Sequence, residues 1–136
     1  MAKYLKKMTH IAPLMIFKLP SPNCNITYSG LRMDHKTVET YVLSMPNAEL
    51  TYPFGEDVAV YKVNDKMFAL IPEKTNPVRI SLKCDPLLAT TLREKYESVM
   101  PGYHLNKKHW NTIILSGQIP WEDIQGFIRH SYDLVK

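Results

Sequence analysis

A predicted β-hairpin constrains the fold of this chain more than any other feature of its sequence. Two segments rich in β-branched and aromatic residues, Val58–Val63 and Met67–Ile71, flank a turn at Asn64-Asp65. Asn and Asp tolerate the backbone conformations of tight turns, so this pattern predicts two antiparallel strands. The chain is therefore expected to build an antiparallel sheet.

Further strands follow this hairpin. The segment 78–83 alternates apolar residues with Arg79, Ser81 and Lys83. Because successive side chains of a strand point to opposite faces, this alternation predicts a half-buried strand with a cationic outer face. Pro101–Leu105 and Trp110–Leu115 are predicted to form a second hairpin. Its tip carries three polar residues, Asn106, Lys107 and Lys108.

Three helices are predicted around these strands. Asp34 and Asp85 are good N-caps for the segments that follow them, and Pro120 begins a third segment with apolar residues at helical spacing. The predicted order is α-β-β-β-α-β-β-α. This order predicts an α+β fold, a two-layer sandwich whose helices cover one face of an antiparallel sheet and leave the other partly open.

The positive charge of the chain is unevenly distributed. Residues 1–32 contain five Lys and Arg and no acidic residue, whereas residues 33–136 contain 12 basic and 13 acidic residues. We expect 1–32 to be a disordered basic extension, with an upstream extension of the true start or a docking segment as alternatives, and 33–136 to be one domain. Phosphate binding by that domain therefore depends on local clustering of its cations and not on net charge.

The sequence predicts a reduced, cytoplasmic protein with no membrane partner. No apolar run reaches the roughly 18 residues expected of a membrane span. The two cysteines, Cys24 and Cys84, have neither paired nor metal-type spacing. We expect a monomer or a weak dimer.

The segment 101–112 is unusually rich in reactive and polar side chains, with two each of His, Lys and Asn beside a Tyr and a Trp. In a nucleic-acid site the lysines would contact phosphates, the rings would stack on bases or sugars, and the amides would form hydrogen bonds. The alternative is a structural turn with Trp110 in the core and solvated lysines. The candidate binding residues of this segment are Tyr103, His104, Asn106, Lys107, Lys108, His109 and Asn111.

Other positions extend this candidate site. Arg79 and Lys83 add cations on one strand face, and Lys62 and Lys66 flank the first hairpin as a second basic tip. The run Tyr52-Pro-Phe-Gly55 is typical of a tight loop at a sheet edge, and it can also line a ligand groove.

The residue pattern favours a protein without catalytic chemistry. His104, His109, Tyr103 and Cys84 are the candidates, but no nucleophile, base and orienting group occur together, and no phosphate-cradling glycine loop is present. Cys84 precedes a helix and can have either a lowered pKa or an inert, buried thiol. The two histidines lack a third metal ligand nearby. We expect no catalytic residue, no cofactor and no metal.

Several ordered motifs resemble the MmcQ/YjbR family over residues 33–136. They are Tyr52-Pro-Phe-Gly-Glu-Asp-Val-Ala-Val60, Lys66-Met-Phe-Ala-Leu70, Leu82-Lys-Cys-Asp-Pro86, Pro101-Gly-Tyr-His104, Asn106-Lys-Lys-His-Trp-Asn-Thr112 and Ser131-Tyr132. The resemblance implies a two-layer α/β fold like that of type III secretion chaperones. It also implies a DNA-binding protein with hairpin wings.

These observations lead to one expected function and one alternative. We expect a non-enzymatic DNA-binding protein that contacts mainly the phosphate backbone, because no helix carries the side chains of a major-groove reader. The alternative is a protein- or peptide-binding adaptor that uses the open sheet or the helix faces.

Overall fold

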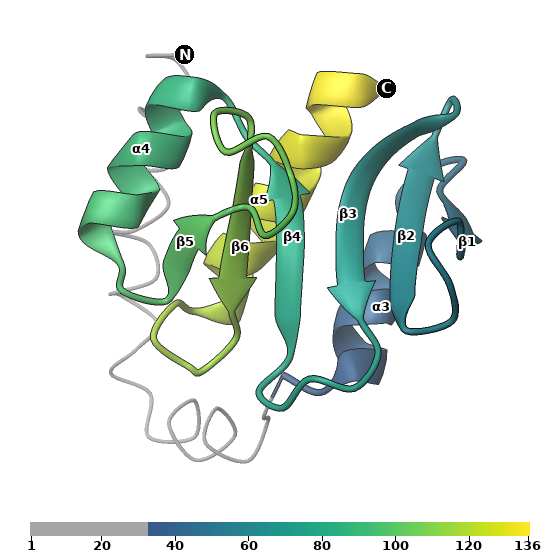
Figure 1. The fold of residues 1–136 in the computed structure, drawn as a ribbon, viewed down its shortest axis with the longest axis horizontal. Coiled ribbons are helices and arrows are strands. Elements are labelled where there is room, and N and C mark those ends of the chain that lie inside the picture. The colour runs from purple at the N-terminus through teal and green to yellow at the C-terminus, as the bar shows by residue number, and fades with distance from the viewer. Residues whose placement is uncertain (1–32) are drawn as a thin grey trace. The chain divides into compact units, whose positions relative to one another are not determined.

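The computed structural model describes residues 33–136 as three helices and one six-stranded sheet (Figure 1). The basic extension predicted for 1–32 lies outside the described residues. In chain order the elements are α3 His35–Leu43, β1 Glu49–Thr51, β2 Val58–Val63, β3 Lys66–Pro72, β4 Arg79–Lys83, α4 Pro86–Lys95, β5 Val99–Pro101, β6 Trp110–Ile114 and α5 Trp121–Val135.

All neighbouring strands of the sheet are antiparallel, in the order β1-β2-β3-β4-β6-β5. The first predicted hairpin is confirmed, with Asn64 and Asp65 at positive φ in its turn. The predicted element order omits β1 and is corrected here. This edge strand has only three residues and none of them is buried, so its sequence carries no alternation of apolar and polar residues to detect.

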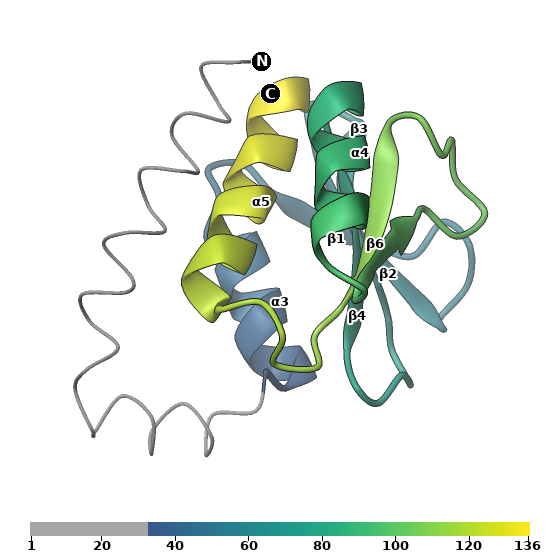
Figure 2. The same cartoon turned by 90° about the vertical axis from the view of Figure 1, so that its left-hand side faces the viewer.

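The helices cover one face of the sheet, as predicted (Figure 2). α5 packs on β3 and β4, and α4 packs on β5 and β6. The buried side chains between the layers include Phe68, Ile80, Leu88, Ile113 and Ile128. No helix of the described residues lies on the opposite face of the sheet.

Two of the three predicted helix starts are confirmed by side-chain capping contacts, and the third helix begins directly after Pro120, as predicted, without one. The Asp34 carboxylate accepts a hydrogen bond from the backbone N–H of Thr37, and this bond lowers the pKa of Asp34. The Asp85 carboxylate accepts from the N–H groups of Leu87 and Leu88 at the start of α4.

No helix in the described part of the chain is both long and apolar enough to cross a bilayer.

The second hairpin differs from its prediction. Its first strand is Val99–Pro101 and not Pro101–Leu105, so the connection to β6 is the long loop 102–109. The strand ends at Pro101 because the following residues adopt turn conformations, with His104 at a φ of 57°. Alternating residue types do not reveal such a backbone change, and this limited the prediction.

A β-bulge lies between β2 and β3, and a helix side chain joins β3 to β4. The β2–β3 register shifts so that Tyr61 pairs with Ala69 and Lys62 with Met67, which leaves Phe68 as the extra residue. β3 and β4 pair only at Ala69↔Leu82 and Leu70↔Ser81. Beyond these pairs, the Ser131 hydroxyl of α5 donates to the Phe68 carbonyl and accepts from the Lys83 N–H. The helix thereby closes a seam between β3 and β4.

Candidate functional site

The sheet face opposite the helices, here called the open face, carries three cations and one acidic side chain, Glu49 of the edge strand β1, which pairs with Lys62. Strand alternation and cross-strand pairing assign its members. They are Glu49, Thr51, Val58, Val60, Lys62, Met67, Leu70, Pro72, Arg79, Ser81, Lys83, Met100, Trp110, Thr112 and Ile114. The face is therefore cationic even though residues 33–136 as a whole are slightly acidic.

An apolar cluster forms part of the open face. Val60, Leu70 and Trp110 are buried there, although they lie on the side of the sheet without helices. Leu105 from loop 102–109 and Met67 pack against them. The loop thus folds back onto the sheet and hides the Trp110 ring, which is only 7% exposed. Trp110 is not available to stack on a base, which corrects that part of the sequence interpretation.

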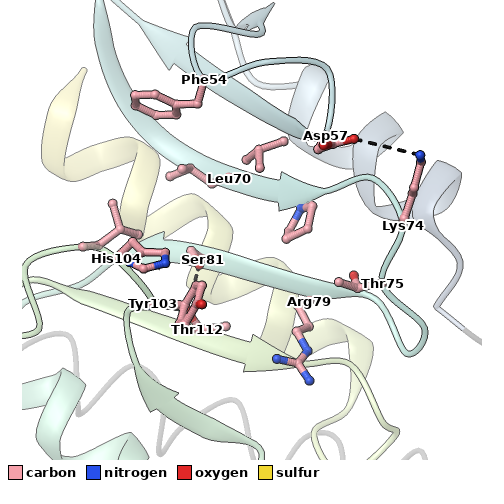
Figure 3. A pocket seen from close by; sticks show the side chains of 13 residues that line it. Phe54, Asp57, Leu70, Lys74, Thr75, Arg79, Ser81, Tyr103, His104 and Thr112 are labelled. Atoms are coloured by element: carbon pink, nitrogen blue, oxygen red, sulfur yellow. Dashed lines mark hydrogen bonds and ion pairs between the residues drawn. The ribbon is translucent and has the colours of Figure 1, made fainter.

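A groove of about 690 Å³ lies beside this cluster (Figure 3). Its floor comes from β2, β3, β4 and β6, and its walls come from the segments 54–57, 72–75 and 103–105. The lining residues are Phe54, Asp57, Val58, Leu70, Pro72, Lys74, Thr75, Arg79, Ser81, Tyr103, His104, Leu105 and Thr112. This volume falls within the range of small-molecule and cofactor pockets.

Two exposed aromatic rings stand on opposite sides of the groove (Figure 3). Phe54 is 64% exposed and Tyr103 is 72% exposed, although large apolar rings are normally buried. Phe54 sits in the turn that begins at Tyr52, whose carbonyl accepts from the N–H of Gly55 at a φ of 102°. This outcome combines the two interpretations of 52–55, because the segment forms a tight loop at the sheet edge and also lines a groove.

The other wall of the groove depends on a close approach at Gly102. Its N–H donates to the Trp110 carbonyl at 2.9 Å, and a Cβ at this position would lie 2.7 Å from the Trp110 Cβ. Only glycine allows this contact without displacing the chain. The next two residues then reach over the sheet, with the rings of Tyr103 and His104 3.9 Å apart.

The floor of the groove contains two hydroxyl groups in contact. Ser81 Oγ and Thr112 Oγ1 lie 2.8 Å apart across β4 and β6, and Thr112 Oγ1 also accepts from the Tyr103 N–H. In addition, the buried Thr75 hydroxyl has no hydrogen-bond partner among the described residues. The groove therefore has apolar walls with a few hydroxyl groups in its lining, a combination typical of ligand sites.

The predicted strand cations are divided between the open face and the β2–β3 turn. Arg79 is the first residue of β4 and lines the groove. Lys83 is the last residue of that strand and pairs with Trp110 of β6. Lys62 and Lys66 flank the β2–β3 turn at the end of the sheet where β4 terminates. The structure therefore brings Lys83 to the same end as this turn and leaves Arg79 at the other end.

Loop 102–109 presents its two lysines to solvent, away from the groove lining. Lys107 and Lys108 are exposed, and the Asn106 side chain accepts from the Lys108 N–H in a tight turn. Arg93 of α4, which no sequence pattern indicated, donates through Nη2 to the Lys107 carbonyl at 2.6 Å. Arg93 and Lys107 are 14 residues apart in sequence. Helical periodicity does not indicate a contact between a helix and a loop at that separation.

Asn111 is corrected from a surface contact to a core residue. It is 2% exposed and faces the helices, where its carbonyl oxygen accepts from Arg93 Nε and its amide donates to the Ala89 carbonyl. Both functional groups of the amide are therefore used inside the protein. His109 is half-buried, and its backbone carbonyl accepts from the Cys84 N–H at 2.7 Å.

The Cys84 thiol is buried and free, and its pKa is raised to about 12, mainly by burial. The alternative of a lowered pKa at the start of α4 is therefore wrong. Nearby His130 accepts from the Asp85 N–H through Nε2, and burial lowers the pKa of this imidazole. Within residues 33–136 no cluster of three His, Cys, Asp or Glu side chains is arranged to hold a metal ion.

None of the ion pairs in the described region includes a cation of the open face. The ion pairs of the described region are His35–Glu73, Lys74–Asp57 and Lys136–Asp133. Only Lys74–Asp57 touches the groove, where both side chains are exposed and 4.0 Å apart. Such an exposed pair is weak. Within 33–136, the charges of Arg79, Lys83, Lys107 and Lys108 are therefore not neutralised by an adjacent carboxylate.

Comparison with known proteins assigns this fold to a family. Residues 43–134 match the sequence model of the YjbR family. The chain is 36% identical to Escherichia coli O157:H7 YbdF over 74% of this chain and 83% of that protein, and 37% identical to Escherichia coli K12 YjbR over 68% and 78%. Among solved structures, it is similar to Deinococcus radiodurans DR2400, a DUF419 domain, with a TM-score of 0.70 and 38% identity over 73% of this chain and 75% of that one. A Pseudomonas syringae protein gives a TM-score of 0.67 with 30% identity over 76% and 100%. The chain belongs to the YjbR family.

Proposed function

We propose that this protein binds DNA without catalysing a reaction, mainly through contacts between its open face and phosphate groups. One observation carries the proposal: the open face has three cations, Lys62, Arg79 and Lys83, against one acidic side chain, Glu49, in a domain whose net charge is slightly negative. Loop 102–109 adds Lys107 and Lys108 beside this face. A local positive field of this kind attracts a polyanion regardless of net charge.

The distribution of these cations favours contacts to phosphates over reading of base edges in a duplex. They lie on strands and loops, and no helix of the described region is placed on the open face to enter a major groove. Phosphate contacts fix position and supply affinity but carry little sequence information. We therefore expect weak or moderate affinity, with little sequence preference in duplex DNA.

The direct test is a titration of fluorescently labelled DNA at two salt concentrations. The full chain should carry Gln in place of Lys3, Lys6, Lys7, Lys18 and Arg32, so that the basic extension cannot account for binding. In this background Lys107→Ala/Lys108→Ala should weaken binding several-fold and reduce the log–log salt slope by about 2.

A matched control removes two positive charges elsewhere. Lys36 lies on α3 and Lys136 follows α5, so Lys36→Ala/Lys136→Ala changes the net charge equally on the helix side. This control should bind as the parent does. A DNA affinity that changes neither with salt nor with either double substitution would overturn the proposal and favour a protein- or peptide-binding adaptor. Equal losses in the two variants would show only a net-charge effect.

A further inference from the structure

The groove on the open face has features that phosphate contacts alone do not require. Two exposed rings, Phe54 and Tyr103, flank an apolar floor of Val58 and Leu70 (Figure 3). Exposed aromatic rings next to cations are the feature that single-strand binding proteins use, because each base offers a flat face on which a ring can stack.

The hydroxyl groups of the floor have an unused donor. Each hydroxyl has one hydrogen to donate, and Thr112 Oγ1 already accepts from the Tyr103 N–H. If Ser81 donates to Thr112, the Thr112 hydrogen has no acceptor among the described residues, and in the opposite case the Ser81 hydrogen has none. Either arrangement leaves one O–H of this buried pair able to donate to a ligand in the groove.

A third hydroxyl group, that of Thr75, also lies in the groove lining. Thr75 Oγ1 is buried in the groove lining and has no hydrogen-bond partner within 33–136. Buried polar groups are normally paired, so this hydroxyl leaves a hydrogen-bonding group unused next to the groove. Every nucleobase carries ring nitrogen or carbonyl acceptors on its edges.

The charge at the groove agrees with a ligand that is both planar and anionic. Arg79 lines the groove, is exposed and has no carboxylate within 4.0 Å among the described residues. The one acidic lining residue, Asp57, is paired with Lys74. A guanidinium group in this position can contact the phosphate of a nucleotide whose base lies on the floor.

We propose that the groove binds an unpaired nucleotide of single-stranded DNA, with its base beside Phe54 and Tyr103 and its phosphate near Arg79. This inference rests on the proposed DNA binding and specifies the form of DNA. In a duplex the base faces are stacked and the edges are paired, so a base reaches such a groove only after leaving the helix. The protein therefore prefers single strands to duplexes of equal length.

The test compares a labelled oligothymidine with a labelled duplex of the same length, using the full chain with its extension neutralised as above. Phe54→Ala and Tyr103→Ala should each raise the Kd for the single strand by about 5- to 150-fold, in line with about 1–3 kcal/mol per stacked base. The Kd for the duplex should change by less than about 2-fold, because duplex bases do not enter the groove.

Two further variants separate stacking from other effects. Leu87→Ala removes a 56%-exposed apolar side chain from α4 and should leave both Kd values unchanged. Ser81→Ala/Thr112→Val removes the hydroxyl pair and should weaken single-strand binding, provided that thermal unfolding shows a folded protein. This variant keeps both rings and all cations, and its effect combines the loss of the hydroxyl donors with the loss of the acceptor for the Tyr103 N–H.

The outcomes distinguish this inference from the proposed function. Equal affinity for both DNA forms, with losses in Lys107→Ala/Lys108→Ala but not in Phe54→Ala or Tyr103→Ala, would overturn the groove assignment and keep phosphate binding. Absence of binding to either DNA would overturn both. A single-strand preference that is lost with either ring and unaffected by Leu87→Ala would establish the inference.

Discussion

Arg93 Nη2 donates a hydrogen bond to the backbone carbonyl of Lys107, and this contact ties helix α4 to the most cationic loop of the domain. The Nε of the same guanidinium donates to the buried Asn111 amide at 2.9 Å. One side chain therefore joins the loop, the helix and β6. The position of Tyr103 and the two loop lysines depends on this core contact as well as on the loop's own turns.

Loss of Arg93 should loosen the loop without removing any groove residue. We expect Arg93→Ala and Asn111→Ala each to lower the free energy of unfolding by about 1–3 kcal/mol, since each leaves a buried hydrogen-bonding group unpaired. Urea denaturation of both single variants and the double variant gives their coupling energy, which should be about 0.5–3 kcal/mol. Additive losses would contradict a direct interaction. Arg93→Lys should not restore stability, because an ammonium lacks the planar fork that reaches both acceptors.

Substitution of Gly102 should displace the groove wall. Gly102→Ala places a Cβ 2.7 Å from the Trp110 Cβ, so we expect a loss of about 1–3 kcal/mol from overpacking. Gly126→Ala is the matched control, because its new Cβ meets only Arg129 Nη2 at 3.8 Å inside α5. This control should raise stability by about 0.5–1 kcal/mol through helix propensity. Thermal unfolding measures both, and a harmless Gly102→Ala would refute the close approach.

The Ser131 hydroxyl should matter more than an exposed serine that also forms a hydrogen bond. Ser131→Ala leaves the Lys83 N–H and the Phe68 carbonyl without their partner at the β3–β4 seam, which should cost about 1–3 kcal/mol. Ser44→Ala removes an exposed hydroxyl that donates to the Tyr41 carbonyl at the end of α3 and should cost less than about 0.5 kcal/mol. Hydrogen exchange should locate the new opening at the Lys83 amide. Equal losses of unfolding free energy in the two variants would show that the Ser131 hydroxyl is not needed to hold β3 and β4 together.

Acidification should weaken the fold through His130. Burial lowers the pKa of His130 below its ordinary value of 6.5, so the unfolded chain binds a proton at a higher pH than the folded protein does. The contribution of the neutral imidazole is therefore complete above about pH 6.5 and falls as the pH drops towards the lower folded pKa. His130→Gln keeps an acceptor for the Asp85 N–H without a titrating ring. Urea midpoints at pH 7.5 and 5.5 should fall further for the parent than for this variant, and equal falls would exclude the mechanism.

The sequence predicted those features of the fold that depend on local chemistry. Asp34 and Asp85 cap their helices, and the alternation around Arg79 and Lys83 assigns both to one strand face. The edge strand β1 was missed because three exposed residues carry no periodicity. The buried state of Asn111 was also missed. Its residue type favours the surface, and only the distant Arg93 and Ala89 make its burial stable.

The groove was only partly predictable for the same reason. The run from Tyr52 to Gly55 indicated a loop that can line a groove, and Tyr103 was a candidate from composition alone. That the two rings face one another across β2, β3, β4 and β6 follows from strand order, which no short segment encodes. The Ser81–Thr112 contact likewise joins residues 31 positions apart.

The two-pair seam between β3 and β4 runs directly beneath the groove floor, where Leu70 and Ser81 face each other. The width of the groove is consequently expected to depend on the hydrogen bonds by which Ser131 of α5 joins β3 and β4 on the helix side of the sheet. A substitution at Ser131, which is buried on the helix side of the sheet, is expected to change the spacing of Phe54 and Tyr103 without contacting either ring. Substitutions at this seam are thus expected to change both the stability of the domain and the affinity of the groove for its ligand.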